Sequence, residues 1–252
     1  SWNSVILQKQ AEFIQLNAQN LREFSEGLLR RIIRKAVYTI QPDLRDLTFR
    51  NVENVIEKIH AKSTGEIDLQ ENLIAVISQN ELIIGNKSKN WIKLIYPQIQ
   101  NQFWMNLLKA DTHQLSEGWN ILINILPRNE VLSFNTDDDF STFLDYEKLE
   151  KQIGVRSKKD GDIFQPIGMK SGKIKVSDFF INEKLIQPAR KNWPLITDSK
   201  DEIIWIPGYK PCHNYRITPE TRMILQIKIE KDRRSYSLCP PERLHIKNHL
   251  SF

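Results

Sequence analysis

The chain has 252 residues and a formal net charge of +5, with 40% hydrophobic and 27% charged residues. This composition is typical of a globular protein and excludes a largely disordered chain. Two cysteines are too few for a disulfide framework, which favours a reducing compartment. No apolar run approaches the ~18 residues that a membrane helix needs, so we expect no membrane span and no membrane partner.

The charge is unevenly distributed along the chain. Residues 151–252 contain 20 Lys and Arg against 11 Asp and Glu, a balance of +9, whereas the remaining 16 basic and 20 acidic residues leave −4. Such segregation favours contact between the C-terminal part and a polyanion. A basic surface that is merely solvated would give the same count, so charge alone leaves both interpretations open.

The first predicted element is a helix over residues 5–40. Apolar residues at i, i+4 and i+8, such as Leu28, Ile32 and Ala36, form one face of it. Pro42 ends the pattern, because proline cannot continue a helix.

A second helix is expected to begin after Thr48, which is a suitable N-cap. Leu47 and Val52 have the spacing of a hydrophobic staple around this cap. Strand-type runs follow the helix and are separated by turn signals. They cover residues 66–70, 73–78 and 81–85, with a further candidate at 90–99.

The remainder of the chain shows strand-type runs among many turns. A soft boundary lies near residues 100–115, and the character of the sequence changes again near Gly154. The runs at residues 118–126, 202–208 and 222–229 are the expected strands. Prolines and the loss of any period after residue 231 indicate a loose terminal segment.

No nucleotide or serine-nucleophile motif occurs in the sequence: it contains no Walker motif, no G-x-G-x-x-G and no G-x-S-x-G. A zinc site is conceivable from the Cys and His residues of the C-terminal part, but no C-x-x-C is present, and free thiols are the better interpretation. These residues are Cys212, His213, Cys239, His245 and His249. The acidic run Asp137–Asp139 is expected to be a solvated loop rather than a cation site. We therefore predict no metal ligand.

The stretch KVSDFFINEK, residues 175–184, combines an apolar core with basic flanks. Ser177 fits an N-cap, and Val176 and Ile181 have staple spacing around it. Phe179, Phe180 and Ile181 are then the buried side of a short helix. Lysines at its rim would stay available for phosphates.

The longer stretch around it, RSKKDGDIFQPIGMKSGKIKVSDFFINEKLIQPARKNWPLI, resembles the C-terminal domain of the tRNA(Ile)-lysidine synthase family. The residues that match the family pattern in order are Arg156, Gly161, Asp162, Pro166, Gly168, Met169, Asp178, Phe179, Phe180, Ile181, Lys184, Arg190, Pro194 and Leu195. Lys210 stands where the family commonly has arginine. Upstream, LLRRIIRKAV and PDLRDLTFRNVENVIEKI are similar to the family's central substrate-binding domain.

The resemblance implies a carbon–nitrogen ligase of tRNA processing. The family adenylates the wobble cytidine of an isoleucine tRNA with ATP and Mg²⁺, and the amine of lysine then displaces AMP. The S-G-G-x-D-S loop that binds the ATP pyrophosphate in the family's N-terminal domain does not occur in these 252 residues. We therefore carry over no catalytic residue, and expect the chain to bind no cofactor and to be inactive alone.

What the resemblance carries over is binding of tRNA(Ile). The central domain would hold the anticodon arm and the C-terminal domain would engage the acceptor-stem region, mostly through phosphates and 2′-hydroxyls. The predicted phosphate contacts are the basic residues Arg156, Lys158, Lys159, Lys170, Lys173, Lys175, Lys184 and Arg190, with Arg30, Arg31 and Arg34 in the central domain.

The expected fold class is α+β. A helical central domain with a small β-hairpin region would span residues 1–110, a mixed α/β tRNA-binding domain residues 111–230, and a loose tail residues 231–252. The alternative function is a stand-alone, non-catalytic RNA-binding protein that has lost the ATP domain. The expected compartment is the cytoplasm, with the plastid stroma as the alternative, and the sequence leaves a homodimer open.

Overall fold

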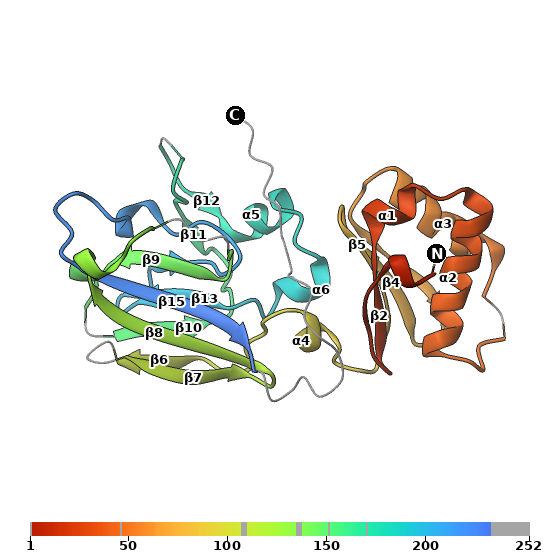
Figure 1. The fold of residues 1–252 in the computed structure, drawn as a ribbon, viewed down its shortest axis with the longest axis horizontal. Helices are drawn as coiled ribbons and strands as arrows, with labels where there is room; N and C mark the ends of the chain where they lie inside the picture. The colour runs from red at the N-terminus through yellow and green to blue at the C-terminus, as the bar shows by residue number, and fades with distance from the viewer. Residues whose placement is uncertain are drawn as a thin grey trace. The chain divides into compact units, whose positions relative to one another are not determined.

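The computed structural model describes residues 2–45, 47–106, 110–134, 138–150, 152–169 and 171–232. The chain divides into two compact units (Figure 1). One contains Ser1–Ile95 and Ile181–Arg190, and the other contains Tyr96–Phe180 and Lys191–Phe252. The sequence placed a boundary at residue 110. In the structure, β6 (Phe103–Asn106) pairs with β10 (Gln152–Arg156), which makes β6 part of the second unit.

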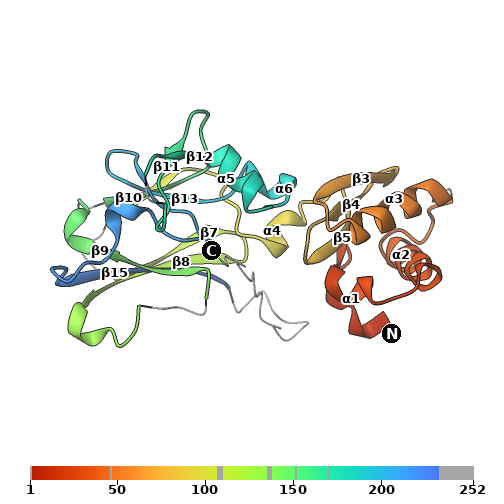
Figure 2. The ribbon, with the colours of Figure 1, turned by 90° about the horizontal axis from the view of Figure 1, so that it is seen from above.

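The first unit is built on an antiparallel sheet of five strands in the order β1-β2-β5-β4-β3. The strands are β1 (Ile6–Lys9), β2 (Phe13–Asn17), β3 (Gly65–Gln70), β4 (Leu73–Ile77) and β5 (Glu81–Asn86). One face is covered by the helices α1 (Ala18–Arg22), α2 (Glu26–Ile40) and α3 (Phe49–His60) (Figure 2). Apolar residues of the helices and of this face form one buried core.

The single helix expected over residues 5–40 is wrong in its first half, which forms β1, β2 and the short α1. Four of the five residues of β2 are buried, so this strand shows no alternation of apolar and polar residues. A strand covered on both faces is hard to distinguish from a helix by its pattern. Ile32 and Ala36 of the expected apolar face are buried in α2. Leu28, which was expected on the same face, is 37% exposed in the first turn of the helix.

The prediction for α3 is confirmed. Thr48 Oγ1 accepts a hydrogen bond from Asn51 N at 3.1 Å, and the staple residues Leu47 and Val52 are both buried. The strands at residues 66–70, 73–78 and 81–85 are confirmed as β3, β4 and β5.

The strand expected at residues 90–99 is wrong. Ile92–Ile95 forms α4, a single turn of helix. The preceding Trp91 lies over Gly85, where an added Cβ would come within 2.4 Å of the indole. Trp91 also packs against Phe13, with ring centroids 6.1 Å apart. Trp91 therefore covers a sheet instead of extending one.

The second unit contains two four-stranded antiparallel sheets and a hairpin. One sheet has the order β14-β13-β10-β6 and the other β7-β8-β15-β9. The remaining strands of this unit are β7 (Asp111–Ser116), β8 (Trp119–Pro127), β9 (Ser141–Asp145), β11 (Ile163–Phe164), β12 (Ile174–Lys175), β13 (Leu195–Asp198), β14 (Ile203–Trp205) and β15 (Met223–Lys231). The helix α5 (Val176–Asn182) follows β12, and the next helix, α6 (Gln187–Arg190), belongs to the first unit. The strands predicted at residues 118–126, 202–208 and 222–229 are confirmed as β8, β14 and β15.

Aromatic side chains join the two sheets of this unit. The ring of Phe140 lies 6.1 Å from that of Trp119 in β8 and 6.3 Å from that of Trp193, which precedes β13. The indole N–H groups are satisfied inside the core, because Trp193 Nε1 donates to Pro207 O and Trp205 Nε1 donates to Tyr209 O. The α+β class is thus confirmed. None of the helices in the described residues has the length and apolar character needed to span a bilayer.

Candidate nucleic-acid interface

The β11–β12 hairpin presents lysines of the predicted basic loop. Its strands pair Ile163 with Lys175 and Phe164 with Ile174. Lys173 and Lys175 are both exposed, and neither forms an ion pair with any residue that the structure describes. Two exposed cations on one short hairpin can approach phosphate oxygens without first breaking an internal contact. Lys170 lies outside the described residues.

The helix α5 anchors this hairpin through aromatic contacts. Phe179 and Phe180 are buried, as expected, with 7% and 0% exposure. The Phe179 ring meets Phe164 edge-on at 4.8 Å and Tyr209 edge-on at 5.1 Å. Edge-to-face pairs of this kind contribute roughly 0.5–1.5 kcal/mol beyond the burial of their area.

Two details predicted for α5 are wrong. The helix begins at Val176, so Ser177 lies inside it instead of capping it. Ile181 is 56% exposed and cannot form a staple with the buried Val176. The physical reason lies in the backbone before the helix: Val176 N already donates to Asp162 O at 2.9 Å, which satisfies an N-terminal amide without a side-chain cap.

Arg156 is buried and structurally engaged, which corrects its expected place on the surface. The residue is 3% exposed. Its Nη1 and Nη2 donate to the two carboxylate oxygens of Asp162 at 2.8 and 2.9 Å, and its Nε donates to Asp201 Oδ1 at 2.5 Å. Nη1 also donates to Ser157 O at 3.0 Å. A guanidinium with these partners holds protein loops together and does not face a phosphate.

The charges of this network support each other electrostatically. Burial by itself would lower the pKa of Arg156, but the hydrogen bonds that it donates to Asp162 and Asp201 outweigh burial and raise that pKa. Burial would likewise raise the pKa of Asp201, yet the hydrogen bonds from Lys159 and Arg156 lower it. Lys159 Nζ lies 2.6 Å from Asp201 Oδ2. Lys159 is therefore committed to the same network, although its side chain is half exposed.

The other predicted phosphate contacts of this stretch differ in how freely they can reach a phosphate. Lys158 Nζ is 3.9 Å from Asp160 Oδ1, a long and weak ion pair. Lys184 is exposed two residues after α5, and it has no ion pair within the described part of the chain. Arg190 is half-buried, and its Nε donates to Leu185 O at 2.8 Å. Lys184 and Arg190 belong to the first unit.

Among the arginines of α2, one is held by salt bridges and two are not ion-paired to a described residue. Arg30 is held by Glu53 at 2.6 Å and by Glu26 at 2.8 Å, and its guanidinium lies over the Phe49 ring. Arg31 is exposed and Arg34 half-buried, and neither is ion-paired to a described residue. Of the arginines predicted here, Arg31 and Arg34 are the ones that can meet an anion without losing a salt bridge.

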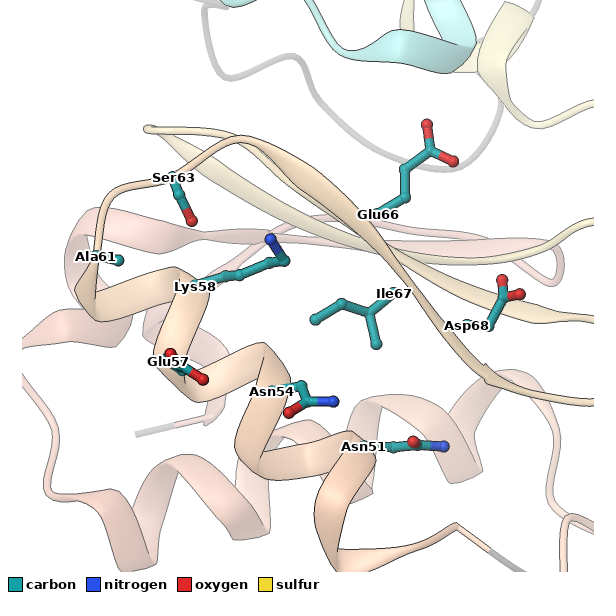
Figure 3. A pocket seen from close by; sticks show the side chains of 9 residues that line it. All are labelled: Asn51, Asn54, Glu57, Lys58, Ala61, Ser63, Glu66, Ile67 and Asp68. Atoms are coloured by element: carbon teal, nitrogen blue, oxygen red, sulfur yellow. The ribbon is translucent and has the colours of Figure 1, made fainter.

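A polar cleft of about 510 Å³, which the sequence did not predict, lies between α3 and β3 (Figure 3). Its charged lining residues are Glu57, Glu66 and Asp68 against the single Lys58. Burial, followed by the charge of Asp68, raises the pKa of Glu66. Asp68 is ion-paired with Lys87, which leaves Glu57 and Glu66 against Lys58 in the lining, a balance that does not favour phosphate.

The described residues offer no metal site. Within them, no three His, Cys, Asp or Glu side chains gather closely enough to hold an ion. Cys212 is a buried free thiol. The other residues considered for zinc, Cys239, His245 and His249, lie outside the described residues, as does Asp137 of the acidic run.

Part of this chain matches a family model, and most of it is similar to known proteins. Residues 153–228 match the family model described as the TilS substrate C-terminal domain. The tRNA(Ile)-lysidine synthase of Caldanaerobacter subterraneus subsp. tengcongensis is 28% identical over 222 residues, which are 88% of this chain and 45% of the relative. That of Dehalococcoides mccartyi is 24% identical over 87% of this chain and 45% of its own length.

The crystal structure of a TILS C-terminal domain aligns with 52% of this chain and 98% of its own, with a TM-score of 0.45 and 20% identity. The chain spans about half the length of the curated relatives it matches. The expected resemblance is confirmed by sequence: most of this chain is similar to tRNA(Ile)-lysidine synthases, and residues 153–228 match the C-terminal domain of that family.

Proposed function

We propose that this chain is the tRNA-binding part of a tRNA(Ile)-lysidine synthase. The observation that carries the proposal is the match of residues 153–228 to the family's substrate C-terminal domain, together with exposed, unpaired lysines on a hairpin of that same stretch. Lys173 and Lys175 would contact phosphates of the tRNA. Lys184, Arg31 and Arg34 are the supporting candidates in the first unit.

In this proposal, ligase chemistry belongs to the part of such an enzyme that carries the S-G-G-x-D-S loop. The residues described here do not fit ATP or Mg²⁺, because they contain neither a phosphate-cradling glycine loop nor a carboxylate cluster suited to an ion. The chain then contributes affinity and placement of tRNA(Ile) in the cytoplasm, and no catalytic step.

Salt dependence of tRNA binding tests the proposal. Each lysine–phosphate contact releases counterions, so log Kd should rise steeply with log salt concentration, by about 0.9 per contact. The measurement is fluorescence anisotropy of labelled tRNA(Ile) titrated with the chain at several salt concentrations. The double variant Lys173→Ala/Lys175→Ala should lower the slope by about 2.

Lys228→Ala is the matched control. Lys228 lies in β15, outside the β11–β12 hairpin, and its Nζ is ion-paired with Glu230 at 3.0 Å. It should leave the slope unchanged. A flat salt response, or equal affinity for heparin and for tRNA, would remove the specific claim.

A further inference from the structure

We infer that Arg156 and Asp162 are positioning residues for RNA binding: their ion pair fixes the base of the β11–β12 hairpin and thereby holds Lys173 and Lys175 in place. The inference rests on the proposed tRNA-binding function and assigns to Arg156 a role different from the phosphate contact that its sequence suggests. It depends on how the pair is connected to its surroundings.

The pair joins a rigid sheet to the hairpin. Arg156 is the last residue of β10, where it is paired with Leu195 of β13. Asp162 directly precedes β11 and closes a turn, since its Oδ2 accepts from Lys159 N at 2.6 Å. Gly161 has φ +86 in this turn, a conformation that favours glycine. The two-point contact between Arg156 and Asp162 therefore sets both the position and the orientation of the turn.

The same aspartate also holds the other end of the hairpin. Asp162 O accepts the amide of Val176 at 2.9 Å, and Val176 is the residue immediately after β12. Lys175 is thus held by its pairing with Ile163 and by the hydrogen bond of the next residue, Val176. A shift of Asp162 moves both strand ends at once, and with them the backbone that carries Lys173 and Lys175.

The other anchors of the hairpin act at different points. Phe164 packs on Phe179, and Pro166 forms an isolated bridge with Cys212. Phe164 pairs with Ile174 of β12, and Pro166 follows β11, so these anchors act away from the end of the hairpin at which Asp162 O accepts the Val176 amide. Loss of the Arg156–Asp162 pair should consequently loosen the lysines while the aromatic core remains packed.

A double-mutant cycle separates positioning from mere stabilisation. In the wild-type background, Lys173→Ala/Lys175→Ala should weaken binding of tRNA(Ile) about tenfold at moderate salt, which corresponds to about 1.4 kcal/mol. In an Arg156→Met background the same double substitution should change the affinity by less than about twofold, because the lysines are already misplaced. Arg156→Met alone should reduce the salt slope as the lysine substitutions do.

Arg156→Lys is a second variant that keeps the test valid if Arg156→Met fails to fold. Lysine keeps the charge and much of the aliphatic stem but cannot form the two-point contact with a carboxylate. It should reproduce the reduced salt slope and the loss of sensitivity to the lysine substitutions. Asp201→Asn is the matched control, because it weakens another contact of Arg156 and leaves the pair with Asp162 intact; it should keep the wild-type slope.

Hydrogen exchange gives a readout that does not involve RNA. The Val176 amide should exchange faster in both Arg156 variants, whereas the amide of Val155, within β10, should keep its protection. Additive effects in the cycle, for Arg156→Lys as well as Arg156→Met, would overturn the inference while leaving tRNA binding in place. If the lysine substitutions have no effect in the wild-type background, the proposed function itself fails.

Discussion

At the residue scale, Glu81 is a carboxyl whose protonation is linked to folding. It lies at the start of β5, and its Oε2 accepts a hydrogen bond from Gln15 Nε2. The residue as a whole keeps partial exposure, yet burial raises the pKa of its carboxyl from 4.5 to about 7, against the opposing effect of Gln15. The folded protein therefore holds a proton over a pH range in which the unfolded chain has released it.

The sign of the pH dependence follows directly. A carboxyl whose pKa is higher in the folded protein than in the unfolded chain adds to the free energy of unfolding. This stabilisation is fully present below the pKa of the unfolded chain and is lost as the pH rises through the pKa of the folded protein. The free energy of unfolding should thus fall between about pH 4.5 and about pH 7 and level off above. Urea titrations across this range test it: Glu81→Gln should remove this part of the decline, and the exposed Glu23→Gln should preserve it.

Basic residues of similar appearance in the sequence have opposite environments in the structure. Arg156 and Lys173 belong to one turn-rich basic stretch, and both were predicted to contact phosphate. The carboxylates that engage Arg156 come from six and 45 positions away in the chain. No local pattern reveals a partner at the longer separation, so the sequence could indicate the basic cluster but could not divide it into buried and exposed members.

At the scale of the element, neighbouring apolar residues of α5 have opposite environments. Phe180 is fully buried, whereas the next residue, Ile181, is 56% exposed. Phe180→Ala should lower the free energy of unfolding by roughly 3–5 kcal/mol, because it leaves a cavity in the core. Ile181→Ala should change it by less than about 0.5 kcal/mol. Chemical denaturation measures both.

The affinity for tRNA should change only as far as the loss of stability leaves part of the chain unfolded. Phe180→Ala should weaken binding to the extent that it unfolds the chain, and Ile181→Ala should leave binding intact. A large loss of stability in Ile181→Ala, or none in Phe180→Ala, would contradict the burial pattern of this helix.

The elements with local signals were the ones that the sequence predicted well. Thr48 caps α3 through its own side chain, and the alternating residues of β8 give a clear strand pattern. By contrast, the pattern of β2 predicts a helix because the strand is buried on both faces. The stretch that contains Trp91 reads as a strand because the covering of Gly85 by its indole leaves no local signal. These errors depend on tertiary packing, which the period of a single segment does not contain.

At the scale of the whole molecule, the order of the elements along the chain does not match their grouping in space. Ile181–Arg190 belongs to the first unit, although the residues on either side of it belong to the second. The α+β class followed from the alternation of helical and strand patterns, but this excursion of ten residues has no signature in the sequence. A boundary drawn at one point of the chain therefore misses part of the first unit.

This grouping predicts that residues 1–95 are incomplete as an isolated unit. The excursion buries Leu185, Ile186 and Ala189, with 6%, 2% and 0% exposure. A fragment of residues 1–95 should accordingly lose up to about 3–6 kcal/mol of unfolding free energy relative to the same unit in the whole chain, since buried Leu and Ile side chains contribute roughly 1.5–3 kcal/mol each. Hydrogen exchange of the β5 amides in both proteins measures the difference.

A peptide of residues 181–190 added to the fragment provides the control. It should restore part of the protection of β5, and the same peptide with Leu185 and Ile186 replaced by Ser should not, because burial of these side chains is the source of the stabilisation. Equal protection in the fragment and the whole chain would show that the excursion adds nothing to the first unit. Restoration by the Ser peptide would show instead that backbone contacts, and not the apolar side chains, hold this segment in the first unit.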